Sequence, residues 1–420
     1  MILKNIKITV VGLGYVGLPL AKEFSKKFEV IGYDNDKNKV KIINKELKTK
    51  SKNSNLEIRD NIKSNNNSNV YIVTVPTPVL KNKIPDLSFL KDATLKIARK
   101  LKQNDFIIYE STVYPGATEE VLIPILEKIS KMKVNKSFYV GYSPERINPG
   151  DKSKGVADIK KIISGSNIYA RKFIFALYKK IIKAGIYVAP NIKIAEAAKI
   201  LENVQRDVNI SLMNEVSLIF SKMNVDTHEV IKAASTKWNF LKFSPGLVGG
   251  HCISVDPYYL KYKSEKIGYS PKVISSGRNV NEKMSSMIVS RVLNYLKKRK
   301  KKIKKIRIGV MGITYKENCP DTRNSQVIKM LNLIRKKKIK FQFCDPFVDK
   351  KKLHLEIKKF YRKKFTNKFD ALILAVSHQQ YLKLSPNYFN KILKENSVVF
   401  DVKNLFNWKK LRKDIKILKL

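Results

Sequence analysis

Apolar residues in the first half of this chain occur in short runs, and most runs are followed by a segment with helical spacing. Short apolar runs bounded by turn residues are typical of buried β-strands. The predicted strands are Ile6–Val11, Glu29–Tyr33, Val70–Val75, Phe106–Tyr109, Phe138–Gly141 and Lys161–Ser164. Strands that alternate with helices in this way predict a parallel, doubly wound α/β sheet.

The same alternation returns after a basic segment at 297–305. There we expect a helix near Val327–Lys337 and strands at Arg307–Met311, Ile339–Cys344, Ala371–Val376 and Ser397–Val402. Between the two α/β regions, one long helix is predicted from Ile192 to about Met223. Its apolar residues broadly follow helical spacing, at Ile194, Ala198, Leu201, Val208, Leu212 and Val216.

These patterns predict an α/β protein with two Rossmann-like, doubly wound domains joined by a helical middle domain with a long central helix. The expected domains are residues 1–190, 191–296 and 306–420. The helix is longer than one domain needs, which favours a dimer formed through the middle domain. Lys199, Asn203 and Arg206 share one face of it, and such a polar stripe is either solvated or part of a site.

The first predicted strand leads into the turn Gly-Leu-Gly-Tyr-Val-Gly at 12–17, and the second ends in Asp34. This is the dinucleotide-binding fingerprint in its required setting of strand, glycine turn, helix, strand and acid. Gly12 permits the tight turn, Gly14 lets a pyrophosphate approach, and Gly17 lets the helix pack closely on the strand. Because a carboxylate would repel a 2′-phosphate, Asp34 favours NAD over NADP.

Three further loops, at 76–78, 110–116 and 143–150, follow predicted strands and are polar or rich in Gly and Pro. The carboxyl ends of parallel strands meet at one edge of a sheet, where ligands of such folds bind. The three loops therefore predict a cleft at that edge.

A separate glycine-rich stretch, Ser244–Tyr259, contains Cys252. The paired Gly249 and Gly250 predict open space against the backbone. A thiol beside such a hollow is either a nucleophile or a buried, inert cysteine. His251 could pair with it, although neighbouring residues seldom face one target.

Composition bears on four features: nucleic-acid binding, membrane spans, disulfides and metal sites. A net charge of +50 suits a nucleic-acid or membrane binder. The lysines are spread along the chain, however, and the densest basic run, 297–305, has no aromatic residue for base stacking. We therefore expect no nucleic-acid partner, but a positive field that attracts an anionic substrate. No apolar run is long enough for a membrane span. Three cysteines without paired spacing predict neither disulfides nor a metal site, which favours the cytoplasm.

Assembled in order, these motifs resemble the nucleotide-sugar 6-dehydrogenases, the superfamily of UDP-glucose dehydrogenase and the UDP-N-acetylhexosamine dehydrogenases. The motifs that carry the resemblance are Gly12–Leu20, Ser111–Gly116, Ser143–Gly150, Glu196–Lys199, Val248–Tyr259 and Lys316–Ser325. The resemblance implies an N-terminal NAD domain, a helical middle that dimerises and a C-terminal domain for UDP. It also implies oxidation of carbon 6 of the sugar from alcohol to carboxylate, with two NAD reduced.

The resemblance further implies a role for each matching residue. The implied catalytic residues are Cys252 as nucleophile, Glu145 as hydrolytic base, Lys199 as oxyanion stabiliser, Asn203 and Asp256 as groups that order a water and the lysine, and Thr112 as a water-holding residue. The implied cofactor residues are Gly12, Gly14, Tyr15, Val16, Gly17, Asp34, Thr77, Thr112 and Arg323. The implied substrate residues are Glu145, Arg146, Asn148, Lys199, Gly249, Gly250 and Lys316.

Val255 stands where UDP-glucose dehydrogenases commonly have a lysine, which favours the N-acetylhexosamine branch. The motifs at 143–150 and 316–325 look most like enzymes of Vi-type and O-antigen polysaccharide synthesis. We therefore expect UDP-N-acetylglucosamine as substrate, with UDP-N-acetylgalactosamine, UDP-glucose and UDP-N-acetylmannosamine as alternatives. Two other classes stay open: a two-electron NAD enzyme acting on hydroxy acids, and a non-catalytic basic binding protein.

Overall fold

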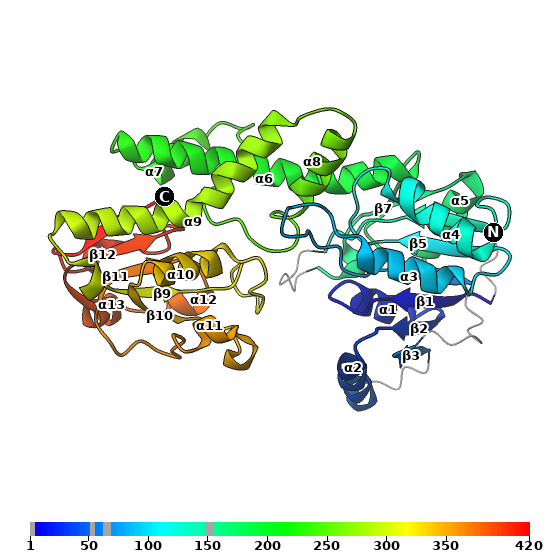
Figure 1. Cartoon of the computed structure of the whole chain (residues 1–420), viewed down its shortest axis with the longest axis horizontal. Helices are drawn as coiled ribbons and strands as arrows, with labels where there is room; N and C mark the ends of the chain where they lie inside the picture. Colours follow the sequence, from blue (N-terminus) through cyan, green and yellow to red (C-terminus); the bar gives the residue numbers. More distant parts are fainter. Residues whose placement is uncertain (1–4, 51–54, 62–68, 148–153) are drawn as a thin grey trace. The chain divides into compact units, whose positions relative to one another are not determined.

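The computed structural model describes residues 5–50, 55–61, 69–147 and 154–420. The chain divides into an N-terminal unit, Met1–Glu202 with Tyr258–Ser270, and a C-terminal unit, Asn203–Pro257 with Pro271–Leu420. Each unit is built around its own sheet (Figure 1). Among the described residues, no helix combines the length and the apolar character that crossing a membrane requires.

The N-terminal unit contains an eight-stranded sheet with the order β3-β2-β1-β4-β5-β6-β7-β8. Its strands are β1 (Lys7–Val11), β2 (Glu29–Tyr33), β3 (Leu56–Arg59), β4 (Val70–Val73), β5 (Asp105–Tyr109), β6 (Phe138–Tyr142), β7 (Lys161–Gly165) and β8 (Ile186–Val188). Every residue of the central strands β4 and β5 is buried, as expected where helices cover both faces. The apolar runs predict six of these strands and miss β3 and β8, which are the two edge strands.

One prediction about this sheet is wrong, because β7 runs antiparallel to β6. A parallel return needs a crossover of a dozen or more residues, usually helical. The described residues between these strands contain only a single 3-10 turn, Val156–Asp158. The start of β7 therefore lies at the sheet edge where β5 and β6 end, and β8 pairs parallel to β7.

Amphipathic helices pack on this sheet. They are α1 (Gly17–Phe24), α2 (Lys37–Lys50), α3 (Ser88–Ala98), α4 (Ile123–Ser130, preceded by the π-helical turn Thr118–Leu122) and α5 (Ile168–Lys179). In α1, Leu20, Ala21 and Phe24 are buried, and they join Ile8 and Val10 of β1 in one apolar core. This packing fixes the N-terminus of α1 above the end of β1.

The C-terminal unit contains a five-stranded parallel sheet with the order β10-β9-β11-β12-β13. Its strands are β9 (Arg307–Met311), β10 (Lys340–Cys344), β11 (Phe369–Leu374), β12 (Leu393–Asp401) and β13 (Lys416–Lys419). Its helices after β9 are α10 (Gln326–Lys336), α11 (Leu355–Lys358), α12 (Gln379–Leu382) and α13 (Pro386–Ile392). The sequence predicts α10 and four strands, and it again misses an edge strand, β13.

The predicted long helix is present as α6 (Ile192–Lys222). Several of the apolar residues that predict it lie on the surface, since Ile194, Leu201 and Leu212 are 42%, 62% and 51% exposed. Beside buried apolar residues such as Ile200 and Val204, the helix buries seven polar ones: Glu196, Lys199, Asn203, Asp207, Ser211, Asn214 and Ser217. These buried polar side chains are the ones that need partners. The remaining helices are α7 (Thr227–Ala234), α8 (Asp256–Lys266) and α9 (Lys272–Lys298).

Candidate active site

The glycine turn after β1 has the close contacts that its sequence demands. Gly12 has a φ of +95°, which residues with a Cβ rarely adopt. A Cβ on Gly17 would lie 1.9 Å from the Gly12 carbonyl oxygen, whereas a Cβ on Gly14 would meet no atom within 4 Å. At the N-terminus of α1, Val16 provides no side-chain cap, and Tyr15 beside it is half exposed. The turn thus leaves open space at a helix N-terminus, where an anion is stabilised.

Asp34, at the end of β2, is buried and held by three hydrogen bonds. Its Oδ2 accepts the backbone N–H of Leu13 at 2.8 Å and pairs with the Lys39 amine at 2.5 Å, and its Oδ1 accepts the N–H of Asp36. Burial alone would raise the pKa of this carboxyl, but these bonds outweigh burial and hold the pKa below its usual range. The carboxylate is therefore ionised and fixed beside the glycine turn.

Two residues that the sequence reasoning did not single out hold loops at the carboxyl edge of this sheet. Tyr259, on α8, is fully buried and donates its hydroxyl to the carbonyl of Thr77 at 2.8 Å. Glu196, on α6, accepts the backbone N–H groups of Gly116 and Thr118 at 2.6 and 3.0 Å. Burial raises the pKa of Glu196 to about 7. The spacing of Glu196 to Lys199 on one helix face could have indicated this role.

The loop after β6 carries Glu145 and Arg146, while Asn148 lies outside the described residues. Glu145 Oε1 accepts the backbone N–H groups of Arg146 and Ile147. The guanidinium of Arg146 pairs with Glu202 at 2.6 Å. Thr112, after β5, is half buried in the same unit. The carboxylate of Glu145 is thus oriented by the backbone of its own loop.

Within the C-terminal unit, the structure brings Asn203 and Asp256 together. The Asn203 amide donates to Asp256 Oδ2 at 2.5 Å, and both side chains are buried. Cys252 is a half-exposed cysteine, and its carbonyl accepts the N–H of Asp256 at 2.9 Å as α8 begins. Lys199 is buried as well, on the part of α6 that belongs to the N-terminal unit. A polar stripe that could have been solvated is therefore largely buried, with Arg206 as its exposed member.

The expected open space is absent on the Cβ side of Gly249 and Gly250. A Cβ on Gly249 would lie 2.9 Å from the Asn324 carbonyl oxygen, and one on Gly250 would lie 2.7 Å from the Tyr315 ring. Gly250 also has a φ of +89°. These glycines let the loop pack under the Tyr315 ring, and a contact this distant in sequence leaves no local signal.

His251 and Arg323 both lie near Asp321. The His251 Nε2 is 3.9 Å from Asp321 Oδ2, and Arg323 pairs with the same carboxylate at 2.6 Å. Burial and the charge of Arg323 lower the pKa of His251. The imidazole is thus directed to a carboxylate on the turn after β9.

A cavity of about 100 Å³ opens at the carboxyl edge of the C-terminal sheet. Gly249, Lys316, Ser377 and Lys403 are among its lining residues. They come from the Cys252 loop and from the ends of β9, β11 and β12. The N-terminus of α10, capped by Ser325, borders the same space. One acid, Glu317, also lines the cavity, and burial lowers the pKa of Lys403. Two lysines and a helix N-terminus at one cavity nevertheless favour an anionic ligand.

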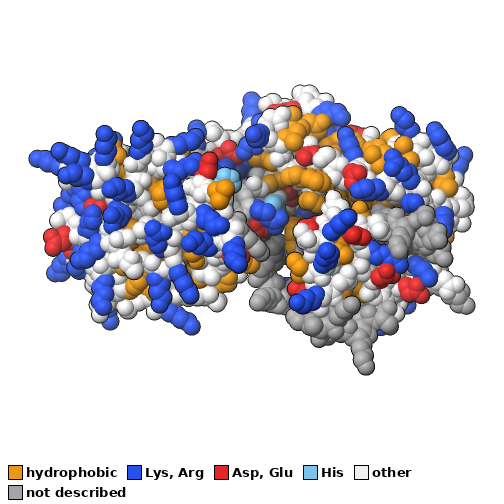
Figure 2. Space-filling view, turned by 60° about the horizontal axis from the view of Figure 1, so that its bottom comes forward, with side chains coloured by type: hydrophobic (Ala, Val, Ile, Leu, Met, Phe, Trp, Pro, Cys, Tyr) orange, Lys and Arg blue, Asp and Glu red, His pale blue; other side chains and the backbone are white. Residues whose placement is uncertain are grey.

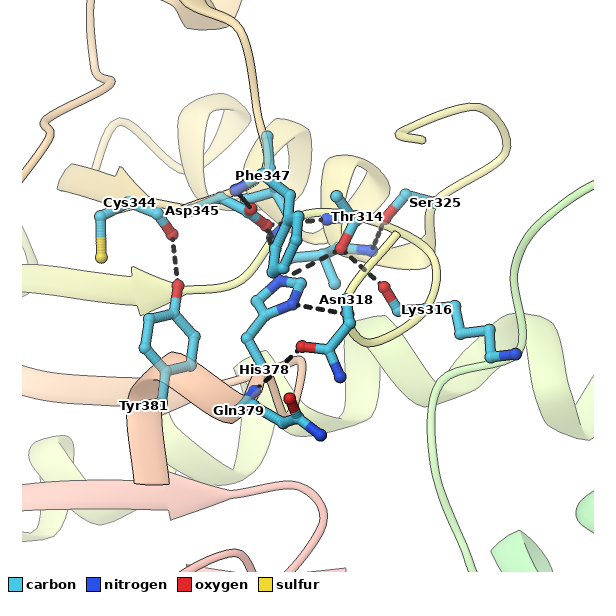
Figure 3. A network of polar contacts seen from close by, with 12 residues as sticks. Thr314, Lys316, Asn318, Ser325, Cys344, Asp345, Phe347, His378, Gln379 and Tyr381 are labelled. Atoms are coloured by element: carbon cyan, nitrogen blue, oxygen red, sulfur yellow. Dashed lines mark hydrogen bonds and ion pairs between the residues drawn. The ribbon is translucent and has the colours of Figure 1, made fainter. Parts of the chain in front are cut away.

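Asp345, at the end of β10, corresponds to Asp34 in position, but its carboxylate is bonded to buried partners. Asp345 Oδ2 accepts the backbone N–H of Ile313 at 2.6 Å and lies 3.1 Å from the buried His378 Nε2. The His378 Nδ1 accepts the N–H of Asn318, so the proton of the imidazole is on Nε2. Figure 3 shows this imidazole between Asp345 and Asn318, with Thr314 beside it. These bonds outweigh burial and hold the pKa of Asp345 below its usual range.

A buried polar network on α6 and α9 holds the loop before Cys252. The Asn214 amide exchanges hydrogen bonds of 2.8 and 3.0 Å with the backbone of Gly246. The same amide donates to Asn281, which donates to Asp207, and Asp207 pairs with Arg278 at 2.6 Å. The sequence reasoning missed these residues, although Asn203, Asp207 and Asn214 recur at helical spacing.

The described residues contain no group of three His, Cys, Asp or Glu side chains that could hold a metal ion. On the face drawn in Figure 2, Lys and Arg side chains are spread over the surface and do not gather into one stripe. The positive charge therefore acts there as a general field.

Three family models match consecutive parts of the chain. They describe the NAD binding domain, the central domain and the UDP binding domain of the UDP-glucose/GDP-mannose dehydrogenase family, and they match residues 6–182, 193–283 and 309–408. The matched residues cover most of the chain.

Similar proteins cover nearly the whole chain as well. UDP-N-acetyl-D-glucosamine 6-dehydrogenase of Pseudomonas aeruginosa is 44% identical, over 96% of this chain and 98% of its own length. The protein of the same name from Salmonella typhi is 42% identical, over 95% of this chain and 96% of its own. Among solved structures, UDP-D-ManNAc dehydrogenase from Pyrococcus horikoshii matches with a TM-score of 0.88 and 30% identity, over 99% of both chains.

Proposed function

Because the chain belongs to the UDP-glucose/GDP-mannose dehydrogenase family, we propose that it oxidises carbon 6 of UDP-N-acetylglucosamine to the carboxylate and reduces two NAD. The observation that supports this choice of substrate is the 44% and 42% identity to proteins named UDP-N-acetyl-D-glucosamine 6-dehydrogenase. The UDP-D-ManNAc dehydrogenase is more distant, at 30%. The product would be a precursor for a surface polysaccharide.

Cys252 would be the nucleophile of the second oxidation. Its thiolate would add to the aldehyde at carbon 6 to give a thiohemiacetal, and oxidation of that adduct would give a thioester. Lys199 would stabilise the negative charge that develops on the oxygen at carbon 6. The hydrogen bond from Asn203 to Asp256 supports a role for both in ordering a water and the lysine.

Hydrolysis of the thioester would use Glu145 as general base. The carboxylate would take a proton from a water held by Thr112, the water oxygen would bond to the thioester carbon, and the carbon–sulfur bond would break to release Cys252 as the thiolate. The two N–H groups that orient Glu145 Oε1 support this assignment, because a base needs a fixed geometry.

The residues of the N-terminal unit fit NAD, whose binding domain the family places here. The open space at Gly14 and the uncapped N-terminus of α1 suit a pyrophosphate, and the ionised Asp34 suits the hydroxyls of a ribose. Thr77 and Arg323 would add contacts to the same cofactor. When bound, NAD would accept a hydride in each of the two oxidation steps.

The UDP-sugar would place its diphosphate in the cavity beside Lys316. The family's UDP binding domain and the amine of Lys403 at the same cavity support this assignment. Arg146 and Asn148 would lie near the N-acetyl group. Gly249 borders the same cavity, and Gly250 would act by fixing the loop.

We also propose that the enzyme is a cytoplasmic homodimer with the three domains expected from the sequence. Leu212 and Ile219, seven residues apart on one face of α6, are 51% and 49% exposed, and Met223, directly after the helix, is 61% exposed. A second copy of the chain would cover this face. Sedimentation velocity at micromolar concentration would test the assignment, and a monomer there would contradict it.

The substrate proposal is tested by incubating the enzyme with NAD and, separately, UDP-N-acetylglucosamine, UDP-N-acetylgalactosamine, UDP-N-acetylmannosamine and UDP-glucose. We expect kcat/KM to be highest for UDP-N-acetylglucosamine. A site built around the amide would lose about 1–3 kcal/mol with glucose, or roughly ten- to a hundredfold. Product mass and NADH are measured together, with two NADH expected per acid formed. A higher kcat/KM with UDP-glucose would contradict the branch assignment and leave the family intact.

The cofactor proposal predicts that kcat/KM is at least about tenfold higher with NAD than with NADP, or about 1.4 kcal/mol. The cause is the charge of Asp34, which the Lys39 amine partly neutralises. Lys39→Ala should therefore widen the preference, and Lys37→Ala, at an exposed lysine that starts the same helix, should leave it unchanged. Equal rates with NAD and NADP in the parent enzyme would show that Asp34 does not face the ribose.

A further inference from the structure

A buried lysine lies between two carboxylates in the N-terminal unit. Lys161, the first residue of β7, is 4% exposed, and its amine is 2.7 Å from Glu110 Oε2 and 3.5 Å from Glu145 Oε2. Glu110 follows β5, and Glu145 lies on the loop after β6. Because β7 is antiparallel to β6, its first residue reaches the edge at which β5 and β6 end. The antiparallel direction of β7 thus places the Lys161 amine at this edge.

The surroundings of the two carboxylates differ. Glu110 is fully buried, and its Oε1 accepts the hydroxyl of Tyr178, on α5. Glu145 Oε2 is buried and accepts no hydrogen bond from the described residues, although Lys161 faces it. The neighbouring cation Arg146 pairs with Glu202 instead. Of the cations described around Glu145, Lys161 is therefore the one that faces its second oxygen.

The charges of this cluster depend on one another. A lysine buried alone would lose its proton, but the two carboxylates outweigh the cost of burial and raise the pKa of Lys161. Burial raises the pKa of Glu110, against the charge of the lysine. One cation thus serves two carboxylates, and removal of either partner changes the field at the other.

We propose that Lys161 is a positioning residue for thioester hydrolysis: its ammonium fixes the Glu145 side chain at the edge where β5 and β6 end, and Glu110 anchors the lysine. This role rests on the proposed function, since that function makes Glu145 the base. Glu145 takes its proton from the attacking water, so its carboxylate must be held at a fixed place. Lys161 does not touch the substrate and acts only through Glu145.

The test compares Lys161→Met with Lys160→Met, at an exposed neighbour whose side chain faces solvent. We expect Lys161→Met to lower kcat at least about tenfold, as for partial loss of a general base. KM for NAD and for UDP-N-acetylglucosamine should stay near the parent values, because Lys161 acts on hydrolysis and not on binding. The covalent thioester should accumulate, as detected by intact-protein mass spectrometry, with a burst of two NADH per active site retained. Lys161→Arg should restore part of the rate, and Lys160→Met should behave as the parent.

Glu110→Gln gives a second variant, which weakens the anchor of the lysine. It keeps a hydrogen-bonding group for Tyr178 and Lys161 but removes the charge that holds the amine. The thioester should accumulate in this variant too, to a smaller extent than in Lys161→Met and with both KM values unchanged. This variant decides the question if Lys161→Met does not fold.

Two results would overturn the role of Lys161. One is a folded Lys161→Met with the kcat and thioester level of Lys160→Met, and the other is a folded Glu110→Gln in which no thioester accumulates. A parent enzyme that forms no NADH from UDP-N-acetylglucosamine would instead overturn the proposed function itself, before any variant is made.

Discussion

The requirement that buried polar groups find hydrogen-bond partners organises this chain more than any single apolar contact does. The polar face of α6 is buried, and several of its side chains find their partners on other elements. Glu196 meets this need with the N–H groups of the turn at 116–118, and Asn214 meets it with the backbone of Gly246. The loops that carry the proposed chemistry are therefore fixed by the hydrogen bonds that a polar helix demands.

The need for hydrogen-bond partners is met differently at the corresponding acids of the two Rossmann-like sheets. Both have an acid after the second strand, and each acid accepts a backbone N–H from the turn after the first strand. In the N-terminal unit the second partner of Asp34 is a lysine on a surface helix, which a ligand can displace. In the C-terminal unit the partner of Asp345 is the fully buried His378. A ribose could therefore compete for the first acid and not for the second, in agreement with the match of the C-terminal part to the family's UDP binding domain.

Local patterns predicted much of the fold. The glycine turn, the central strands and the length of α6 follow from patterns in consecutive residues. Each of these predictions is confirmed. The three strands that were missed, β3, β8 and β13, are all at sheet edges, where one side lacks the cover that makes a run apolar. The direction of β7, the buried face of α6 and the packing of Tyr315 on Gly250 depend on distant residues, so periodicity could not supply them. Lys161 was missed for the same reason, because only the antiparallel strand brings it to Glu110 and Glu145.

In the proposed mechanism, Cys252 binds the aldehyde formed by the first oxidation and holds it covalently through the second. The most direct measurement is the yield of uronic acid per NADH formed by Cys252→Ala with UDP-N-acetylglucosamine and NAD, beside Cys344→Ala, which removes a cysteine from the core. The account predicts that Cys252→Ala binds NAD as the parent does and forms no acid, while Cys344→Ala forms one acid for every two NADH. Acid formation by Cys252→Ala at a rate near that of the parent would contradict the covalent mechanism.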